Sequence, residues 1–80
     1  MITINLPITI DISNLESKCE VFKDRYLHNP IIIMSNATIS SLSKDFKQIS
    51  KNEPNKCIAL FNGYKIFRDD DLDFGEVQLR

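Results

Sequence analysis

The dipeptide Asn62-Gly63 stands between two apolar runs, and it constrains the fold of this chain more than any other feature. A two-residue hairpin turn of type I′ needs positive φ angles at both central residues, which Asn and Gly adopt at the least cost. Residues 57–61 before the dipeptide are apolar enough for an interior strand, and residues 64–67 after it suit a return strand. We therefore predict a β-hairpin in the C-terminal half.

A second strand is predicted at the start of the chain, where apolar and polar residues alternate over residues 2–12. This period of two places all the large aliphatic side chains of the segment on one face, which is typical of a half-buried strand. Pro7 has no amide hydrogen, and proline within a sheet is confined to edge strands or bulges. We expect this strand at an edge of the sheet, or bent at Pro7.

Two helices are predicted between these strands. The first spans about residues 14–28, because apolar residues recur there at helical spacing: Leu15, Cys19, Phe22 and Tyr26. The second begins at Ser35 or Asn36, which can cap it, and places one apolar stripe on its inner face: Ile39, Leu42, Phe46 and Ile49. Between the helices, residues 31–34 form a run that is apolar on both faces, as expected for a central strand.

The last residues recover a short alternation after an acidic interruption, with three candidate core residues: Phe74, Val77 and Leu79. The order of elements is then β-α-β-α-β-β-β. We predict a single α+β domain over residues 1–80, with two helices on one face of a four- or five-stranded mixed sheet that ends in the hairpin. Folding 80 residues buries only a small core, so partner binding or self-association is a reasonable expectation.

The charges are balanced overall but polarised along the chain, whose formal net charge is -1. Residues 39–68 are net basic and residues 69–80 are net acidic. Four lysines are expected on the basic side, where they can contact phosphates or simply keep a helix soluble: Lys44, Lys47, Lys51 and Lys56. Because there is no strong net field and no arginine-rich or stacking motif, we predict no direct nucleic-acid binding and no membrane association.

Few residues are suited to chemistry. The two cysteines, Cys19 and Cys57, lie in apolar segments and are predicted to be reduced core thiols. His28 is the single histidine, which excludes a two-histidine metal site, and we expect it to contact the last carbonyls of a helix. The chain has two glycines and no glycine-rich phosphate loop. The sequence therefore predicts no catalytic residues, no metal, no cofactor and no enzyme activity.

Residues 69–76 hold five of the eleven carboxylates of the chain. Their spacing imitates the start of a calcium loop, but the glycine falls one position late and no glutamate stands at the twelfth position. Two interpretations remain, a solvated turn between strands and a contact patch for a basic partner. For the contact patch we predict the acidic residues together with two neighbours on the hairpin: Asp69, Asp70, Asp71, Asp73, Glu76, Tyr64 and Arg68.

Residues 30–80 carry a resemblance. The stretch Pro30-Ile-Ile-Ile-Met-Ser35, the hairpin segment from Asn62 to Phe67 and the ending Phe74-Gly-Glu-Val77 resemble small uncharacterised proteins encoded by phages and prophages of low-GC bacteria. The start of the sequence lacks the basic region of a signal peptide, and the longest apolar run, residues 31–34, is too short to span a bilayer, so we expect a cytoplasmic location. The resemblance implies that this is the cytoplasm of a bacterial host. A short protein of this type, without catalytic signature, is expected to bind and block a host defence component such as a CRISPR effector.

The alternative that the same resemblance allows is a virion component, a minor capsid or head-tail protein. The expected partner of an inhibitor is a host protein, such as a nucleic-acid-binding immune effector. We also keep a homodimer of the chain as an alternative. A virion part should instead associate with itself into large symmetric assemblies. The sequence favours the inhibitor.

Overall fold

The structure is a computed structural model that describes residues 2–5, 12–51 and 56–80. It confirms the α+β class, with two helices and a mixed sheet. The strands and helices are, in chain order, β1 (Ile2–Asn5), α1 (Ile12–Tyr26), β2 (Ile32–Met34), α2 (Asn36–Leu42), a single 3₁₀ turn η1 (Ser43–Asp45), β3 (Lys47–Gln48), β4 (Cys57–Phe61), β5 (Tyr64–Arg68) and β6 (Glu76–Leu79).

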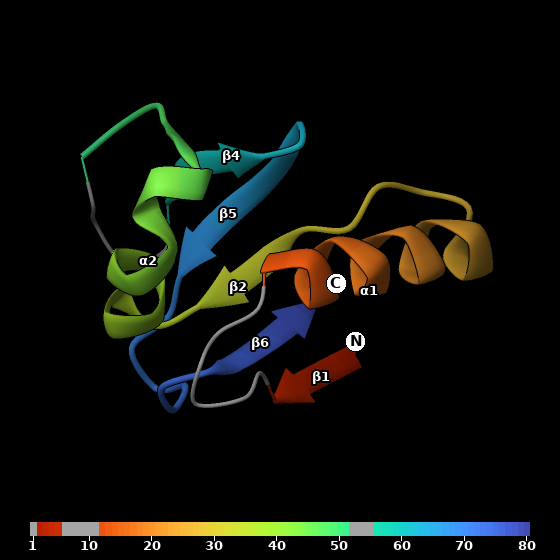
Figure 1. Cartoon of the computed structure of the whole chain (residues 1–80), viewed down its shortest axis with the longest axis horizontal. Coiled ribbons are helices and arrows are strands. Elements are labelled where there is room, and N and C mark those ends of the chain that lie inside the picture. Colours follow the sequence, from red (N-terminus) through yellow and green to blue (C-terminus); the bar gives the residue numbers. More distant parts are fainter. Residues whose placement is uncertain (1, 6–11, 52–55) are drawn as a thin grey trace.

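The six strands form one sheet in the order β1-β6-β2-β5-β4-β3 (Figure 1). The neighbours β2 and β5 are parallel, and every other neighbouring pair is antiparallel. The predicted central strand is therefore confirmed in β2, and β1 lies at the predicted edge. The strand predicted over residues 2–12 is described only as far as Asn5. Residues 6–11, with the bend expected at Pro7, lie outside the described residues, and Ile12 begins α1 instead of ending the strand. The two-residue strand β3 at the opposite edge adds to the five longer strands, and its pairing with β4 was not anticipated.

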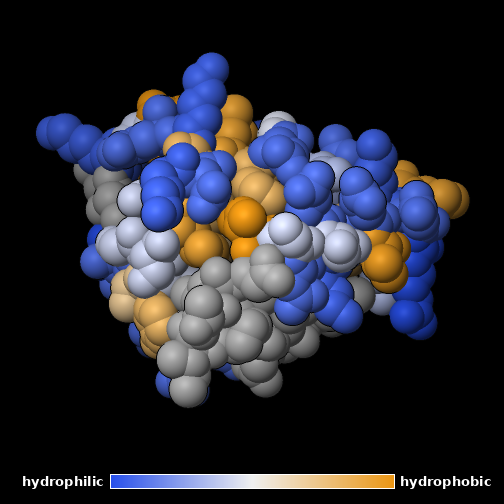
Figure 2. Space-filling model, in the orientation of Figure 1, coloured by the Kyte–Doolittle hydropathy of each residue, from blue (hydrophilic) through white to orange (hydrophobic). Residues whose placement is uncertain are grey.

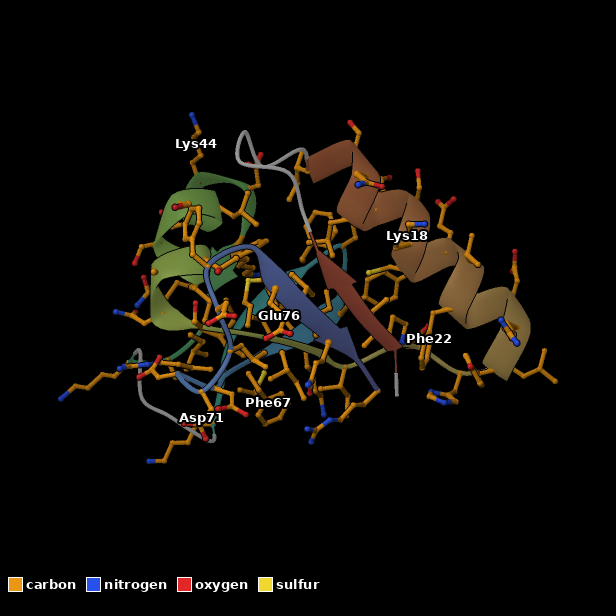
Figure 3. The ribbon with its side chains drawn as sticks, turned by 90° about the horizontal axis from the view of Figure 1, so that it is seen from below. Lys18, Phe22, Lys44, Phe67, Asp71 and Glu76 are labelled. Atoms are coloured by element: carbon orange, nitrogen blue, oxygen red, sulfur yellow. The ribbon has the colours of Figure 1, made fainter. Side chains whose placement is uncertain are left out.

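Both helices lie on the same face of the sheet, as Figures 1 and 3 show. The hydrophobic core fills the space between the two layers, and Phe22 points from α1 into it. It is built from one stripe of each helix and the inward residues of four strands: Leu15, Cys19, Phe22, Ile32, Met34, Ile39, Leu42, Ile58, Ala59, Phe61, Ile66, Val77 and Leu79. None of the described elements covers the opposite face of the sheet.

The predicted hairpin is confirmed between β4 and β5. Phe61 pairs with Tyr64, so the turn holds the two residues Asn62 and Gly63, whose φ angles are 51° and 83°. Both angles lie in the left-handed region that a type I′ turn requires. The one register shift in this pair lies between Cys57 and Ala59, in β4.

The second helix is shorter than the sequence pattern predicts. It ends at Leu42, and the chain passes through η1 into β3 instead of continuing to residue 49. Serines explain the early end, because the hydroxyls of Ser41 and Ser43 donate to backbone carbonyls within the same turn of chain and compete with helical pairing. Phe46 still packs against the core from an extended backbone, but Ile49 is 49% exposed and its predicted place on a buried stripe is wrong.

Two further residues of the apolar patterns, Tyr26 of the helical stripe and the core candidate Phe74, lie outside the core. Tyr26 is at the last position of α1, where the helix has passed the edge of the core, and it is 42% exposed. Phe74 precedes β6, and Gly75, with a φ angle of 83°, turns the chain between them. The alternation of β6 therefore does not extend back to Phe74, which is 53% exposed.

Candidate functional site

The acidic residues lie in a short turn that joins β5 to β6, which we call the acidic turn and define as residues 69–75. Its backbone is closed by hydrogen bonds at both ends. The amide of Asp69 donates to the carbonyl of Met34 over 3.0 Å, and the amide of Glu76 donates to the carbonyl of Asp73 over 3.0 Å. The first bond attaches the start of the turn to the end of β2, and the second closes its last residues into a tight turn before β6.

Asp70 ties the acidic turn to α2. Its two carboxylate oxygens share the single Nε hydrogen of Arg68, at 3.0 Å each, and one of them pairs with the guanidinium Nη2 at 2.6 Å. It also accepts the backbone amide of Asn36, the first residue of α2, over 3.0 Å. The hydrogen bonds from Arg68, and then the one from Asn36, lower the pKa of Asp70 below its ordinary value. This carboxylate is occupied within the fold.

A buried hydroxyl forms the second tie between the acidic turn and α2. Oγ1 of Thr38 accepts the backbone amide of Gly75 over 3.0 Å and lies 3.0 Å from Oγ of Ser35. Ser35 caps α2 by accepting the amide of Thr38. Thr38 is fully buried, so a polar network holds the end of the turn in the core layer. A link between residues so far apart in sequence leaves no signal in a local pattern.

The remaining acidic side chains divide into two kinds. Asp69 accepts the amide of Asp71 over 3.0 Å, and Glu76 accepts the amide of Asp73 over 3.3 Å, so both support the turn itself. The carboxylates of Asp71 and Asp73 are exposed and accept no hydrogen bond from any residue that the structure describes. Asp71 and Asp73 are therefore the two acids of this group that are not used in hydrogen bonds within the described chain.

An aromatic side chain accompanies these two free carboxylates. Phe74 follows Asp73 directly and is among the most exposed large apolar residues of the described chain. In Figure 3, Asp71 lies on the acidic turn at the border of the uncovered sheet face. The exposed part of the acidic turn thus combines two negative charges with one aromatic ring.

Tyr64 lies apart from the other predicted contact residues. It stands at the opposite end of β5 from Arg68, about 13 Å away along the strand, and packs against the core under α1. Burial, and then the thiol and carboxyl groups of α1, raise the pKa of its phenol above the ordinary value. The structure therefore brings together the five acids and Arg68, and it leaves Tyr64 outside the group.

The predicted basic helix face does not exist in the form expected. Lys44 lies in η1 and Lys47 in β3, while Lys51 and Lys56 are outside the helices altogether. The early end of α2 at Leu42 distributes these lysines over several elements. Figure 2 shows mostly hydrophilic side chains over the two helices, with apolar atoms visible between them.

The two thiols differ in exposure. Cys19 is fully buried in the core, and burial followed by the charge of Glu16 raises its pKa from 9.0 to about 12. Its thiolate is therefore scarce at neutral pH, which agrees with the prediction of a core thiol. Cys57 is half-buried and its Sγ lies 3.7 Å from the carbonyl oxygen of Ala59. The structure places Cys57 at the sheet surface, not in the core.

His28 is exposed after the end of α1. Its Nδ1 lies 3.0 Å from the carbonyl oxygen of Asn29, and its ring meets that of Phe22 edge to face at 5.2 Å between centroids. This carbonyl belongs to the loop after α1. His28 therefore contacts a loop carbonyl and not, as predicted, the last carbonyls of the helix. Within the described ranges, no three residues of the types that ligate metals gather into a cluster.

Two shallow hollows mark the described surface. One, of about 230 Å³, lies between α2 and the β3 edge and is lined mainly by serines and apolar side chains. The other, of about 270 Å³, lies on the uncovered sheet face and is lined by Ile31, Ile33, Phe67, Asp69 and Arg80. Both are smaller than the 300–1,000 Å³ typical of sites for drug-sized ligands. They suit side chains of a macromolecular partner better.

Comparisons of the chain with protein-family models, curated proteins and solved structures found no match. None of the described helices is long and apolar enough to cross a membrane. The resemblance of residues 30–80 to phage proteins accordingly stays a prediction, and the geometry of the acidic turn carries what can be proposed about function.

Proposed function

We propose that this chain is a non-enzymatic protein-interaction domain of phage type, which binds a bacterial defence component through its acidic turn and blocks it. The observation that carries the proposal is the display of Phe74 beside two unoccupied carboxylates on a turn that is anchored to α2 at both ends. The resemblance of residues 30–80 supports the proposed phage origin, and the site supports the proposed mode of binding.

An anchored turn binds more tightly than a mobile one of the same composition. Ordering a loop at an interface costs free energy, and that cost is already met when internal hydrogen bonds hold the turn before the partner arrives. The ties through Asp70 and Thr38 fulfil this condition. The backbone that carries Phe74 is therefore held in place, which suits an anchor residue of an interface.

The chemistry of the acidic turn selects a partner with a basic rim around an apolar pocket. Phe74 would enter the pocket, and the carboxylates of Asp71 and Asp73 would face lysines or arginines on the rim. Proteins that bind nucleic acids carry such basic surfaces, and opposite charge also accelerates the encounter. A nucleic-acid-binding immune effector fits this description, and a protein bound at its basic surface would compete with the nucleic acid.

The test is inhibition of a guide-loaded CRISPR effector in a DNA-cleavage assay, with binding measured in parallel by surface plasmon resonance. We expect the triple variant Asp71→Ser, Asp73→Ser, Phe74→Ala to lose at least tenfold in affinity and inhibition, while circular dichroism remains that of the wild type. Effectors from several bacterial defence systems form the panel. Failure of the wild-type chain to inhibit any of them would count against the inhibitor function.

A matched control removes the same chemistry from another surface. The variant Glu20→Ser, Val21→Ala, Asp24→Ser deletes two exposed carboxylates and one exposed apolar side chain from α1. It should bind and inhibit like the wild type. Equal loss of affinity in both triple variants would mean that overall charge, and not the acidic turn, drives the interaction.

The virion component remains the second candidate, and the uncovered sheet face with its apolar side chains is the observation that favours it. Capsid and head-tail proteins associate through such surfaces into rings or shells. Size-exclusion chromatography with light scattering separates the two functions. Assemblies of many subunits would replace the inhibitor proposal by the virion one, whereas a monomer or dimer supports the inhibitor.

A further inference from the structure

The uncovered face of the sheet has an apolar centre. Side chains alternate along each strand, so the residues between those of the core point away from the helices. In the register of the sheet, Ile33 of β2 lies between Phe67 of β5 and Gln78 of β6, and Phe67 lies beside Cys57 of β4. Figure 3 shows Phe67 on the side of the sheet away from both helices. Ile33 is 7% exposed between these neighbours, and Cys57, Phe67 and Gln78 are half-buried.

One end of the uncovered face is basic. Ile31 exchanges two backbone hydrogen bonds with Arg80, at 2.9 and 3.0 Å, so Arg80 stands level with the start of β2. The parallel register of β2 and β5 pairs Ile32 with Ile66, which brings Lys65 to the same level on the other side. Two cations therefore flank Ile31, which is 38% exposed.

The other end of the uncovered face is acidic. The amide of Asp69 donates to the carbonyl of Met34, which sets Asp69 just beyond the end of β2. On the opposite side of β2, Met34 pairs with Val77, so Glu76 stands at the same level as Asp69. The face thus carries a basic end, an apolar middle and an acidic end, and about 13 Å of strand separates the two charged ends.

The charges on this face are complementary to those on the same face of a second, suitably rotated copy. When a second copy is placed face to face with its strands antiparallel, a two-fold axis runs across the strands through the apolar middle. Arg80 then faces Glu76 of the second copy, Lys65 faces its Asp69, and each pair occurs twice. With the strands parallel, like charges would meet at both ends. Symmetric dimers use one patch on both subunits, which is the condition that this face meets.

The size of the face agrees with a small dimer. The domain measures 30 × 25 × 22 Å, so one broad face presents on the order of 700 Å². A standard protein interface buries about 800 Å² per partner. Two aligned sheets also pack in this way in β-sandwiches, with side chains of the facing surfaces interdigitating. The hollow on this face is lined by Ile31, Ile33 and Phe67 and also by Asp69 and Arg80, so it offers the second copy both apolar and charged contacts.

We propose that two copies of this chain form a symmetric dimer through the uncovered sheet faces, held by the apolar centre and by four ion pairs between opposite ends. The proposal is independent of the proposed function, because Asp71, Asp73 and Phe74 are not part of the paired rows. In each subunit Asp71, Asp73 and Phe74 stay at the rim of the dimer, so the dimer presents these three residues at two places.

The experiment is sedimentation equilibrium of the wild type and of the variant Lys65→Glu, Arg80→Glu over about 1 to 300 μM. We expect the wild type to approach twice the mass of one chain, 9.2 kDa. In the variant both ends of the face are acidic, so its dissociation constant should rise at least tenfold. Raising the salt from 50 to 500 mM should weaken the wild-type dimer, because rim ion pairs are screened.

Two further variants make the outcome decisive. Lys18→Glu, Lys44→Glu makes the same charge change on the helix layer and should dimerise like the wild type. The reverse variant Asp69→Lys, Glu76→Lys should fail to pair with itself but should pair with Lys65→Glu, Arg80→Glu. A wild type that stays monomeric, or a Lys65→Glu, Arg80→Glu variant that dimerises unchanged, would overturn the proposal and assign the face to another occupant.

Discussion

The two faces of the sheet are built from the same strands but obey different rules. On the face under the helices, the inward residues are aliphatic and almost fully excluded from water, as Ile32, Ile66 and Leu79 illustrate. On the uncovered face, the residues between them mix apolar and charged side chains, with Phe67 between Lys65 and Asp69. Packing on the first face stabilises the fold. The second face contributes less to stability and is available for contacts with other molecules.

The largest expected contrast between the faces compares neighbours on β5. Ile66→Ala removes a side chain from the packed core, so unfolding should require about 3 kcal/mol less. Phe67→Ala removes a larger side chain from the uncovered face and should cost the monomer about 1 kcal/mol or less. Urea unfolding at about 1 μM, where association is weak, measures both changes. Similar losses in the two variants would contradict the distinction between the faces.

A smaller loss of stability is expected when the hydrogen bond between the core layer and the acidic turn is removed. Thr38→Val keeps the shape of the side chain but leaves the amide of Gly75 without its acceptor, which should cost about 1–3 kcal/mol. Thr38→Ser retains the hydroxyl and should recover the polar part of this loss. Urea unfolding gives the stabilities, and faster hydrogen exchange at Gly75 in Thr38→Val would locate the effect. Unchanged exchange at that amide would argue against the tie.

The smallest of these effects uses the two thiols, one on each side of the sheet. Cys19 has a folded-state pKa of about 12 against 9.0 ordinarily, so above pH 9 the unfolded chain loses its thiol proton first. This stabilising contribution is complete below pH 9 and is lost as the pH rises towards 12. By pH 10 the wild type should lose roughly 1 kcal/mol more than Cys19→Ala does, measured by urea unfolding from pH 8 to 10.

Thiol labelling supplies the control for that titration. Cys57 lies half-buried at the surface of the uncovered face, and iodoacetamide should label it in the folded monomer. Cys19 should react only after unfolding, and mass spectrometry of peptides distinguishes the two sites. Rapid native labelling of Cys19 would show that the core opens at this point and would refute its role as an inert core thiol.

Local patterns predicted the elements of this fold well where each pattern had one physical cause. Asn62-Gly63 predicted the hairpin, and the apolar run around Ile33 predicted the central strand. The pattern failed where two causes competed. The stripe that includes Ile49 favoured a long helix, but the serines before it ended α2 early, and the residues that followed joined the sheet as β3.

The sequence predicts which residues make up the candidate site but not which hydrogen bonds they form. The sequence shows five clustered carboxylates, and their place in a turn follows from the interrupted alternation. That Asp70 is occupied by Arg68 and the start of α2, or that Thr38 holds Gly75, depends on contacts made only after the sheet is assembled. The charged ends of the uncovered face likewise arise from the strand order, which brings Lys65 and Arg80 level with each other.

The position of β6 has a consequence for how the chain reaches this structure. Among the described strands β6 comes last in the sequence, yet it lies between β1 and β2, and Ile2 pairs with Leu79. Among the described strands β1 has no other neighbour, so during synthesis it must wait until residues 76–79 have left the ribosome. Pairings between distant parts of a chain form slowly, because a long loop has to close first. We therefore expect the α2–β4–β5 region to form early and the closing of the sheet by β6 to be the late, rate-limiting event.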